Sequence, residues 1–371
     1  MKICIVSPSL NHGGAERVAS LWADGFVERG HDVFFVANIE DEVYSLGKEI
    51  HLLPLTTPDG NKLSRYFGAT RRLRKYFKTY HPDVIIGVMY ACSLLAKIAS
   101  LGLGIPVINT EHNSFERPEQ QPMYYLDKIA KYYVNHLYDA ITVLTEADLL
   151  VIKNRFKRVF VLPNPTFLTP LSSIPHKEKI ILAAGRLDAW YVKGFDNLIK
   201  SFGLIMIDET LNIKDSRWRL QIAGTGSEES LAYLKQLCKE NGVEDSVDFL
   251  GFRTDIEELY KKSEIFVLSS RSEGFGLVLV EAMSQGCACV ACDYKGRQRE
   301  IIKDESMGLC CPPDDVDALA KSMAIMITND NYRRLIQNNA VNRSKSYSRD
   351  IIMSRWEQLL SQVVETKKHG T

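Results

Sequence analysis

The chain has 371 residues, of which 45% are hydrophobic and 25% charged, and its 46 Lys and Arg balance 46 Asp and Glu. This length suggests two domains of roughly 100–200 residues each, both large enough to bury a core. The zero net charge excludes a field that would draw nucleic acid to the whole protein. No apolar run reaches the roughly 20 residues of a membrane-spanning helix. The short apolar start resembles a strand and not a signal peptide, so we expect a cytoplasmic protein.

Short apolar runs alternate with helical patterns in the first half of the chain. Periodic apolar spacing predicts helices at residues 15–29, 91–101 and 124–137. Runs rich in Val and Ile predict strands at 3–7, 33–37, 84–88, 107–109, 140–144 and 159–162. Strands with so few charges suit a parallel sheet that helices cover on both faces.

The same rhythm restarts near Lys179, after a stretch at 163–176 that contains several prolines. Strands are predicted at 180–183, 220–223, 247–250, 265–268 and 288–291, and an amphipathic helix at 351–364. We therefore expect an α/β protein of two Rossmann-like, doubly wound domains that face a cleft. The expected domains are 1–168 and 169–345, with residues 346–371 returning to the first domain.

Two groups of residues could suggest a metal site. The cysteines at 287, 289 and 292 lie in an apolar run of strand length, and those at 310 and 311 end another, which indicates buried thiols. Asp315 and Asp317 follow two prolines and precede an apolar run, which indicates a helix start with capping acids. We therefore expect no metal at either place.

Gly13 and Gly14 stand between the first predicted strand and the following helix. Glycines at such a turn let the backbone approach a ligand, and the helix N-terminus presents free N–H groups to an anion. Many α/β proteins need glycines there for packing alone. The pair by itself leaves both explanations open.

Arg186 and Lys193 follow the first strand of the second half. Ligands of open α/β sheets bind at the carboxyl ends of strands. An Arg fork and a Lys point charge can hold a diphosphate there and stabilise it as it leaves. The alternative is two solvated surface cations, and their position favours the diphosphate.

Residues 273–281, EGFGLVLVE, follow the predicted strand at 265–268. The glycines favour a tight turn before a helix from about residue 275 to 285, with Glu273 in the loop and Glu281 about two turns into the helix. That offset is roughly 9 Å along the axis, so the carboxylates could bind different hydroxyl groups of one elongated ligand. It disfavours a retaining glycosidase, whose carboxyls lie about 5–5.5 Å apart. A capping role would explain Glu273 but not the whole motif.

Taken together and in this order, these motifs resemble the retaining glycosyltransferases of family four, which have the GT-B fold. The resemblance covers nearly the whole chain. It implies that Arg186 and Lys193 bind the donor diphosphate, that Glu273 holds the transferred sugar and that Glu281 holds the ribose. It also implies that His112 lies near the reacting sugar. Further donor contacts are implied at Gly13, Gly14, Gly226, Phe252, Gly274, Phe275, Gly276 and Leu277.

The resemblance leaves the sugar open. Residues 296–300 align loosely with a sugar-facing loop of the family, but Lys295, Arg297 and Gln298 depart from its commonest pattern. Such enzymes need no metal and no cofactor, because cationic side chains and helix dipoles stabilise the leaving diphosphate.

Residues 62–78 contain seven Lys or Arg and no acid, with aromatic and Leu residues interleaved. One interpretation is a basic amphipathic helix that docks on an anionic membrane, which suits a lipid-linked acceptor. The other is a core-packed helix with a solvated basic face. The cations assigned to the acceptor and membrane side are Arg71, Arg72, Arg74 and Lys75.

The expected activity is retaining transfer of a hexose-type sugar from a nucleoside-diphosphate sugar, such as a UDP-sugar, to a hydroxyl. The acceptor would be a saccharide, including a lipid-linked one in cell-envelope polysaccharide synthesis, at the inner face of the membrane. Two alternatives stay open: a nucleotide-sugar epimerase of similar fold, which consumes donor without acceptor, and a non-catalytic sugar-nucleotide binder, which turns over nothing.

Overall fold

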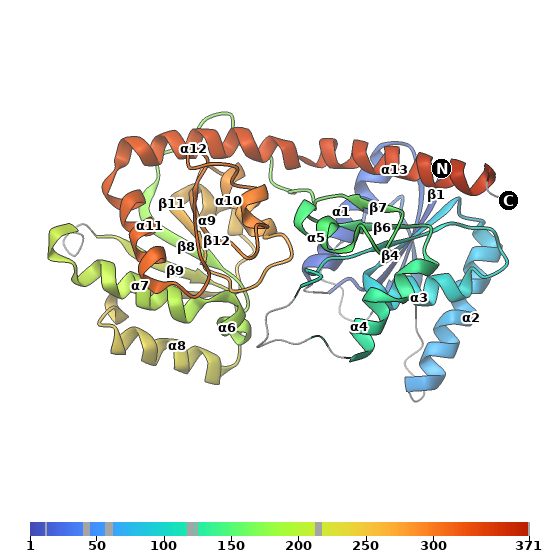
Figure 1. Cartoon of the computed structure of the whole chain (residues 1–371), viewed down its shortest axis with the longest axis horizontal. Helices are drawn as coiled ribbons and strands as arrows, with labels where there is room; N and C mark the ends of the chain where they lie inside the picture. Colours follow the sequence, from blue (N-terminus) through green and yellow to red (C-terminus); the bar gives the residue numbers. More distant parts are fainter. Residues whose placement is uncertain are drawn as a thin grey trace. The chain divides into compact units, whose positions relative to one another are not determined.

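The computed structural model describes residues 1–11, 13–39, 45–55, 62–116, 123, 125–211 and 217–369. The chain folds into two compact units, one formed by Met1–Pro165 with Arg349–Thr371 and the other by Thr166–Ser348. Each unit is a parallel sheet with helices packed on it, which is the expected α/β architecture (Figure 1). The sequence predicted that the first two domains end at residues 168 and 345, and the observed boundaries follow residues 165 and 348.

The first unit contains a seven-stranded parallel sheet of order β3-β2-β1-β4-β5-β6-β7. Its central strands are apolar on both faces, and all five residues of β4 are buried. The strands are β1 (Lys2–Ser9), β2 (Asp32–Asn38), β3 (His51–Pro54), β4 (Val84–Val88), β5 (Val107–Thr110), β6 (Ala140–Val143) and β7 (Val159–Val161). Strand β3 was not predicted, because this edge strand is short, half-exposed and ends in proline.

The helices of the first unit are α1 (Gly14–Glu28), α2 (Lys62–Tyr80), α3 (Met89–Ala99), α4 (Tyr125–Tyr132), α5 (Glu146–Ile152) and α13 (Arg349–His369), with a 3-10 turn η1 (Val134–Leu137). The single helix expected at 124–137 is therefore interrupted after Tyr132. The C-terminal helix α13 packs back on this unit, as expected: Trp356 meets Trp22 of α1 edge-on, with ring centroids 4.8 Å apart.

The second unit contains a six-stranded parallel sheet of order β10-β9-β8-β11-β12-β13. The strands are β8 (Glu178–Ala184), β9 (Arg219–Ala223), β10 (Val247–Gly251), β11 (Ser263–Leu268), β12 (Ala288–Cys292) and β13 (Leu309–Cys311). Strand β13 was not predicted, because three residues at a sheet edge carry little periodic signal. The chain adds β9 and β10 on one side of β8, then β11 to β13 on the other, so the strand order reverses between β8 and β11.

Helices flank this second sheet. They are α6 (Trp190–Lys193), α7 (Phe195–Ile207), α8 (Glu228–Glu240), α9 (Ile256–Lys262), α10 (Leu277–Ser284), α11 (Val316–Thr328) and α12 (Asp330–Ser344), with 3-10 turns η2 (Leu187–Ala189), η3 (Glu209–Leu211), η5 (Glu244–Ser246), η6 (Gln298–Glu300) and η7 (Lys345–Tyr347). Asp315 caps α11 by accepting the Ala318 N–H at 2.8 Å, as its sequence context predicts. The eight cysteines are free thiols, seven buried and Cys310 half-buried.

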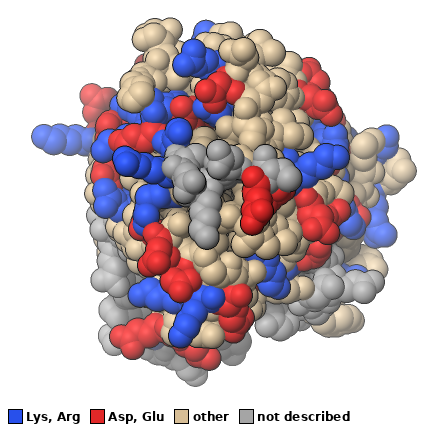
Figure 2. Space-filling model, turned by 90° about the vertical axis from the view of Figure 1, so that its left-hand side faces the viewer, with Lys and Arg blue, Asp and Glu red and all other residues tan. Residues whose placement is uncertain are grey.

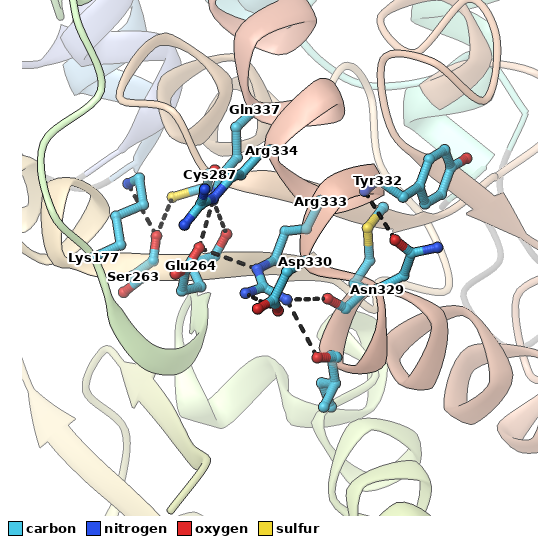
Figure 3. A network of polar contacts seen from close by, with 12 residues as sticks. Lys177, Ser263, Glu264, Cys287, Asn329, Asp330, Tyr332, Arg333, Arg334 and Gln337 are labelled. Carbon is cyan, nitrogen blue, oxygen red and sulfur yellow. Dashed lines mark hydrogen bonds and ion pairs between the residues drawn. The ribbon is translucent and has the colours of Figure 1, made fainter. Parts of the chain in front are cut away.

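A buried polar network ties the elements of the second unit together (Figure 3). The guanidinium of Arg333 in α12 donates to Glu264 of β11 at 3.1 Å and to the carbonyl oxygen of Met326 at 2.7 Å. Gln337, one turn along α12, donates to the same Glu264 carboxylate at 2.7 Å. These bonds fix α12 and the end of α11 against β11.

The ammonium of Lys177 is buried beside this network, just before β8 (Figure 3). It donates to four carbonyl oxygens, those of Tyr260 at 2.9 Å and of Lys261, Ser263 and Gln285 at 3.0 Å. Three of these carbonyls belong to the C-terminal ends of α9 and α10, where helix dipoles favour a positive charge. The Lys177 side chain thus joins the ends of two helices to a strand.

Charges of both signs intermix on the face of the molecule drawn in Figure 2, which agrees with the balanced composition. Within the described part of the chain, no helix has the length and apolar character needed to cross a bilayer.

Candidate functional site

The carboxyl ends of β8 and β11 lie side by side at the strand-order reversal of the second unit. Open parallel sheets bind ligands at such a position, because loops from neighbouring strands diverge there and leave a crevice. The segment 185–193 follows β8, and the segment 269–276 follows β11. The sequence-predicted cations and the first acid therefore come from two adjacent strand ends.

The structure brings Lys193 and Glu273 into direct contact. The Lys193 Nζ lies 2.5 Å from the Glu273 Oε1, and the two side chains are 25% and 15% exposed. The Ser270 hydroxyl donates to the same carboxylate oxygen at 2.9 Å. A partly buried charge pair is strong yet reachable, so an anion can displace the carboxylate from the ammonium, and the freed carboxylate can accept hydrogen bonds from hydroxyl groups.

The backbone around Lys193 is fixed to the loop after β11. Gly194 has a φ of +64°, and a Cβ there would lie 2.0 Å from the carbonyl oxygen of Ser269, so only glycine fits. The Ser269 hydroxyl donates to the carbonyl of Lys193 at 2.8 Å. These contacts explain why Lys193-Gly194 is needed as a unit: the glycine lets the lysine lie against the loop that carries Glu273.

Arg271 is a positioning residue that the sequence analysis missed. Its guanidinium is 8% exposed and donates to both carboxylate oxygens of Asp196, at 2.7 and 2.9 Å, to the Tyr191 carbonyl at 2.6 Å and to Asp314. It therefore holds the α6 and α7 segments against the loop that bears Glu273. Nothing in the sequence distinguishes it from a solvated cation, because its partners lie more than 40 residues away.

Arg186 follows β8 after Gly185 and is exposed at the same end of the sheet. Its neighbour Asp188 accepts the Ser227 backbone N–H at 2.7 Å, which joins the loops after β8 and β9. Gly224, in the second of these loops, has a φ of +148°, and a Cβ there would lie 1.8 Å from the Gly185 carbonyl oxygen. Gly226 lies two residues further on. These glycines thus bring the two strand ends close together.

The first turn of α10 differs from the expectation. The helix begins at Leu277, after Gly276 in a left-handed conformation, and not near 275. Glu281 is therefore the fifth helical residue, little more than one turn in, and its carboxylate is 3% exposed and accepts a hydrogen bond from the buried Tyr260 hydroxyl at 3.2 Å. The residue expected to hold the ribose, Glu281, is thus buried and hydrogen-bonded within the protein in this structure.

The other residues of the second unit that were expected to contact the sugar donor differ in their burial. Phe275 is 3% exposed, and its ring packs edge-on against Tyr347 at 5.5 Å, so its side chain belongs to the core. Gly274 before it and Leu277 after it are half-buried. Phe252 follows β10 and is 59% exposed at the carboxyl end of the sheet, where an aromatic ring can stack on a flat ligand.

In the first unit, α1 begins at Gly14 with Gly13 as its N-cap. A Cβ at Gly14 would meet no described atom within 4 Å, so packing does not require glycine there. At Gly13, by contrast, a Cβ would lie 1.7 Å from a carboxylate oxygen of Glu16, so the two glycines differ in what surrounds them.

His112 follows β5 in the first unit. The Thr110 hydroxyl donates its proton to the Gly87 carbonyl at 3.0 Å, so the contact of 3.1 Å between the Thr110 Oγ1 and the His112 Nε2 requires that Nε2 carries the hydrogen. The Nδ1 is then an acceptor, buried and without a partner among the described residues. Burial lowers the pKa of His112 from 6.5 to about 4, so the ring is neutral at pH 7.

The loop that carries His112 is held by a buried pair that the sequence analysis did not identify. Glu111 and Lys131 are both 4% exposed, and their charged groups are 3.2 Å apart. The Lys131 ammonium also donates to the carbonyls of Asn113 and Ser114, at 3.3 and 3.2 Å. This pair therefore fixes the backbone on both sides of His112.

The low pKa of His112 gives a pH prediction. His112 takes up a proton near pH 6.5 in the unfolded chain but only near pH 4 in the folded protein. The contribution of neutral His112 to the free energy of unfolding is therefore complete above pH 6.5 and is lost as the pH falls towards 4. His112→Gln should remove this loss, which is at most about 3 kcal/mol. Urea unfolding of both proteins at pH 4.5 and pH 7 measures the difference. An equal change in the free energy of unfolding between pH 7 and pH 4.5 in the two proteins would contradict this prediction.

Comparisons with known proteins agree with this architecture. The family described as "Glycosyltransferase Family 4" matches residues 12–167, and that described as "Glycosyl transferases group 1" matches residues 169–343. An "Uncharacterized glycosyltransferase" of Haemophilus influenzae is 28% identical and covers 94% of this chain and 96% of its own length. A Campylobacter jejuni "GalNAc-alpha-(1->4)-GalNAc-alpha-(1->3)-diNAcBac-PP-undecaprenol alpha-1,4-N-acetyl-D-galactosaminyltransferase" is 27% identical and covers 98% of this chain and 99% of its own length.

Solved structures show the same fold. Sucrose-phosphate synthase from Thermosynechococcus elongatus superposes with a TM-score of 0.78 at 19% identity, over 98% of this chain and 99% of that one. Anabaena HepE in complex with UDP-glucose superposes with a TM-score of 0.77 at 18% identity, over 98% and 100%. At these identities the likeness concerns the fold alone. The two family matches follow one another along nearly the whole sequence, and the chain is therefore a glycosyltransferase of family four with two α/β units of the GT-B type.

Proposed function

We propose that the enzyme transfers a hexose-type sugar from a UDP-sugar to a hydroxyl of a lipid-linked saccharide, with retention at the anomeric carbon. The observation that carries the proposal is the contact between Lys193 and Glu273 at the strand-order reversal of the second unit. Two similarities support the substrates: HepE was solved with UDP-glucose, and the Campylobacter relative is named for an undecaprenol-linked saccharide.

The proposed roles follow from charge and position. Arg186 and Lys193 bind the donor diphosphate, and Glu273 exchanges its bond to Lys193 for hydroxyl groups of the sugar. The bond between the anomeric carbon and the diphosphate oxygen breaks, and the acceptor oxygen bonds to that carbon on the same face. The leaving diphosphate takes the acceptor proton. The cationic side chains stabilise its charge, so the proposal requires no metal.

His112 can contribute one specific contact. Since its Nε2 holds the hydrogen towards Thr110, the free lone pair is at Nδ1. We propose that this lone pair accepts a hydrogen bond from a hydroxyl of the transferred sugar. A neutral acceptor suits this role across the physiological pH range, because the pKa of the ring is about 4.

A donor screen tests the proposed reaction. Nucleoside diphosphate release is measured for a panel of UDP-sugars, with and without an undecaprenol-linked saccharide, and NMR of the product gives the anomeric configuration. Release that depends on acceptor, with a retained product, supports the proposal. Consumption of donor without acceptor would instead indicate the epimerase, and donor binding without turnover would indicate the non-catalytic binder.

Membrane docking by α2 is a separate proposal, and the structure changes which residues carry it. Arg74 donates to the carbonyls of Ala99 and Leu101 at 2.9 and 2.7 Å and so caps the end of α3, which makes it a structural residue. Arg72 is half-buried. The cations that are exposed along α2 include Arg71, Lys75 and Lys78. Phe67, at 73% exposure, lies towards the start of the same helix.

We expect Arg71→Gln/Lys75→Gln/Lys78→Gln to weaken binding to anionic vesicles. At about 1 kcal/mol per cation near the surface, the loss is about 3 kcal/mol, or roughly 100-fold. Co-sedimentation with phosphatidylglycerol vesicles at low salt measures it, with Lys235→Gln/Lys239→Gln on α8, which removes two exposed cations of the second unit, as the control. Equal binding of both variants would refute docking through α2.

A further inference from the structure

A cavity lies in the first unit, and none of its lining residues is assigned to catalysis. Its volume is about 240 Å³, and its lining residues are Asn135, His136, Tyr138, Ile141, Arg155, Lys157 and Arg158, with Phe156. They belong to segments that lead into the amino ends of β6 and β7. His112, by contrast, follows the carboxyl end of β5. The cavity therefore lies at the amino ends of the strands, whereas the His112 loop lies at their carboxyl ends.

Among the described residues that line the cavity, Arg155, Lys157 and Arg158 are cations and none is an acid. Within the described chain, Arg155, Lys157 and Arg158 form no ion pair, and His136 can donate an N–H in either protonation state. The acid close by in sequence is Asp139, whose two carboxylate oxygens each bond an ammonium at 2.9 Å, those of Lys97 and Lys367. Its negative charge is already matched.

One lining residue, Tyr138, keeps its hydroxyl in the protein interior. Tyr138 is 8% exposed, and its phenol oxygen is buried without a hydrogen-bond partner among the described residues. Such a group costs about 1–3 kcal/mol when it stays unbonded, which is unusual in a folded protein. Because solvent does not reach this oxygen, a ligand of the cavity cannot bond it, and only other atoms of Tyr138 belong to the lining. The neighbouring Asn135 differs, because both ends of its amide are bonded within the protein.

The backbone holds these cations in place. The turn after α5 is closed by the Phe156 N–H, which donates to the Ile152 carbonyl at 3.1 Å, and the Phe156 ring is buried. The Arg155 guanidinium lies over the Tyr132 ring at 5.1 Å, and the His136 ring lies 4.7 Å from that of Phe156. The carbonyl of Arg158 accepts the Ile141 N–H at 2.9 Å, which anchors the segment to the sheet.

We propose that this cavity binds a phosphate group, separately from the donor site. Two guanidinium groups, one ammonium and an imidazole N–H form a donor set that suits an oxyanion with several acceptor oxygens. The volume is below the roughly 300–1,000 Å³ of sites for drug-sized ligands, so it suits a phosphate or a small phosphate ester. A soluble phosphate ester and an anionic lipid headgroup share this chemistry.

Calorimetric titration of the full chain with inorganic phosphate and with glucose 1-phosphate tests the soluble source. We expect saturable binding that Arg155→Gln/Arg158→Gln weakens at least 10-fold and that Tyr138→Phe leaves unchanged. Lys153→Gln, an exposed lysine of the same segment that does not line the cavity, is the matched control. Arg186→Gln should retain this binding, which separates the cavity from the donor site.

Vesicles test the lipid source. In the Arg71→Gln/Lys75→Gln/Lys78→Gln background, co-sedimentation with phosphatidylglycerol vesicles should fall on adding Arg155→Gln/Arg158→Gln if the headgroup is the ligand, and stay unchanged if the ligand is soluble. Circular dichroism confirms that the variants fold. The proposal is overturned if neither probe binds saturably, or if Arg155→Gln/Arg158→Gln and Lys153→Gln bind both probes equally.

Discussion

Lys193→Ala is expected to lower kcat/KM for the donor about 100- to 1,000-fold, the usual cost of removing one group that stabilises developing charge. The Lys193 ammonium lies at the strand-order reversal, and Gly194 and Ser269 fix its backbone against the loop of Glu273. Steady-state kinetics with the best donor of the screen measure the effect.

The control and a companion variant distinguish this role from a general loss of fold. Lys235→Ala removes an exposed lysine of α8 in the same unit and should keep normal activity. Glu273→Gln removes the charge partner but keeps the shape, and should lower kcat more than it weakens nucleoside diphosphate binding. Normal activity in both Lys193→Ala and Glu273→Gln would contradict the site assignment.

Lys177→Met is expected to destabilise the second unit by about 3–5 kcal/mol, because it removes a buried ammonium and leaves carbonyl oxygens without their donor. Those oxygens lie at the C-terminal ends of α9 and α10 and in β11, at 2.9–3.0 Å from Nζ. For a unit of this size, 1 kcal/mol corresponds to roughly 2–4 °C in Tm, so we expect the transition to fall by roughly 6–20 °C. Scanning calorimetry measures it.

Lys179→Met is the matched control, since Lys179 stands two residues away in β8 and is exposed. Its effect should stay within about 0.5 kcal/mol. An equal, small change in both variants would show that the four carbonyls do not depend on Lys177.

Buried central strands could be read from the sequence, because both faces are apolar and the runs stand out. Strand β4 was predicted with its observed bounds. The edge strands β3 and β13 were missed, since a partly exposed strand of three or four residues has too few residues to show a pattern. The start of α10 was placed two residues early, because the left-handed Gly276 that sets it is a backbone property.

The candidate site was predictable only for residues whose place in the fold follows from the order of the strands. Lys193 and Glu273 follow strands that a doubly wound sheet makes neighbours, and they are 2.5 Å apart. Arg271 and Lys177 escaped prediction because their partners are distant in sequence. Arg74 was assigned to a membrane surface, since composition does not reveal that its guanidinium caps α3.

A crystal structure of the enzyme with a bound nucleoside diphosphate tests the central claim most directly. The diphosphate should lie within hydrogen-bond distance of the Arg186 guanidinium and the Lys193 ammonium, with Glu273 no longer bonded to Lys193. A diphosphate bound elsewhere, with the Lys193–Glu273 pair intact, would contradict the account.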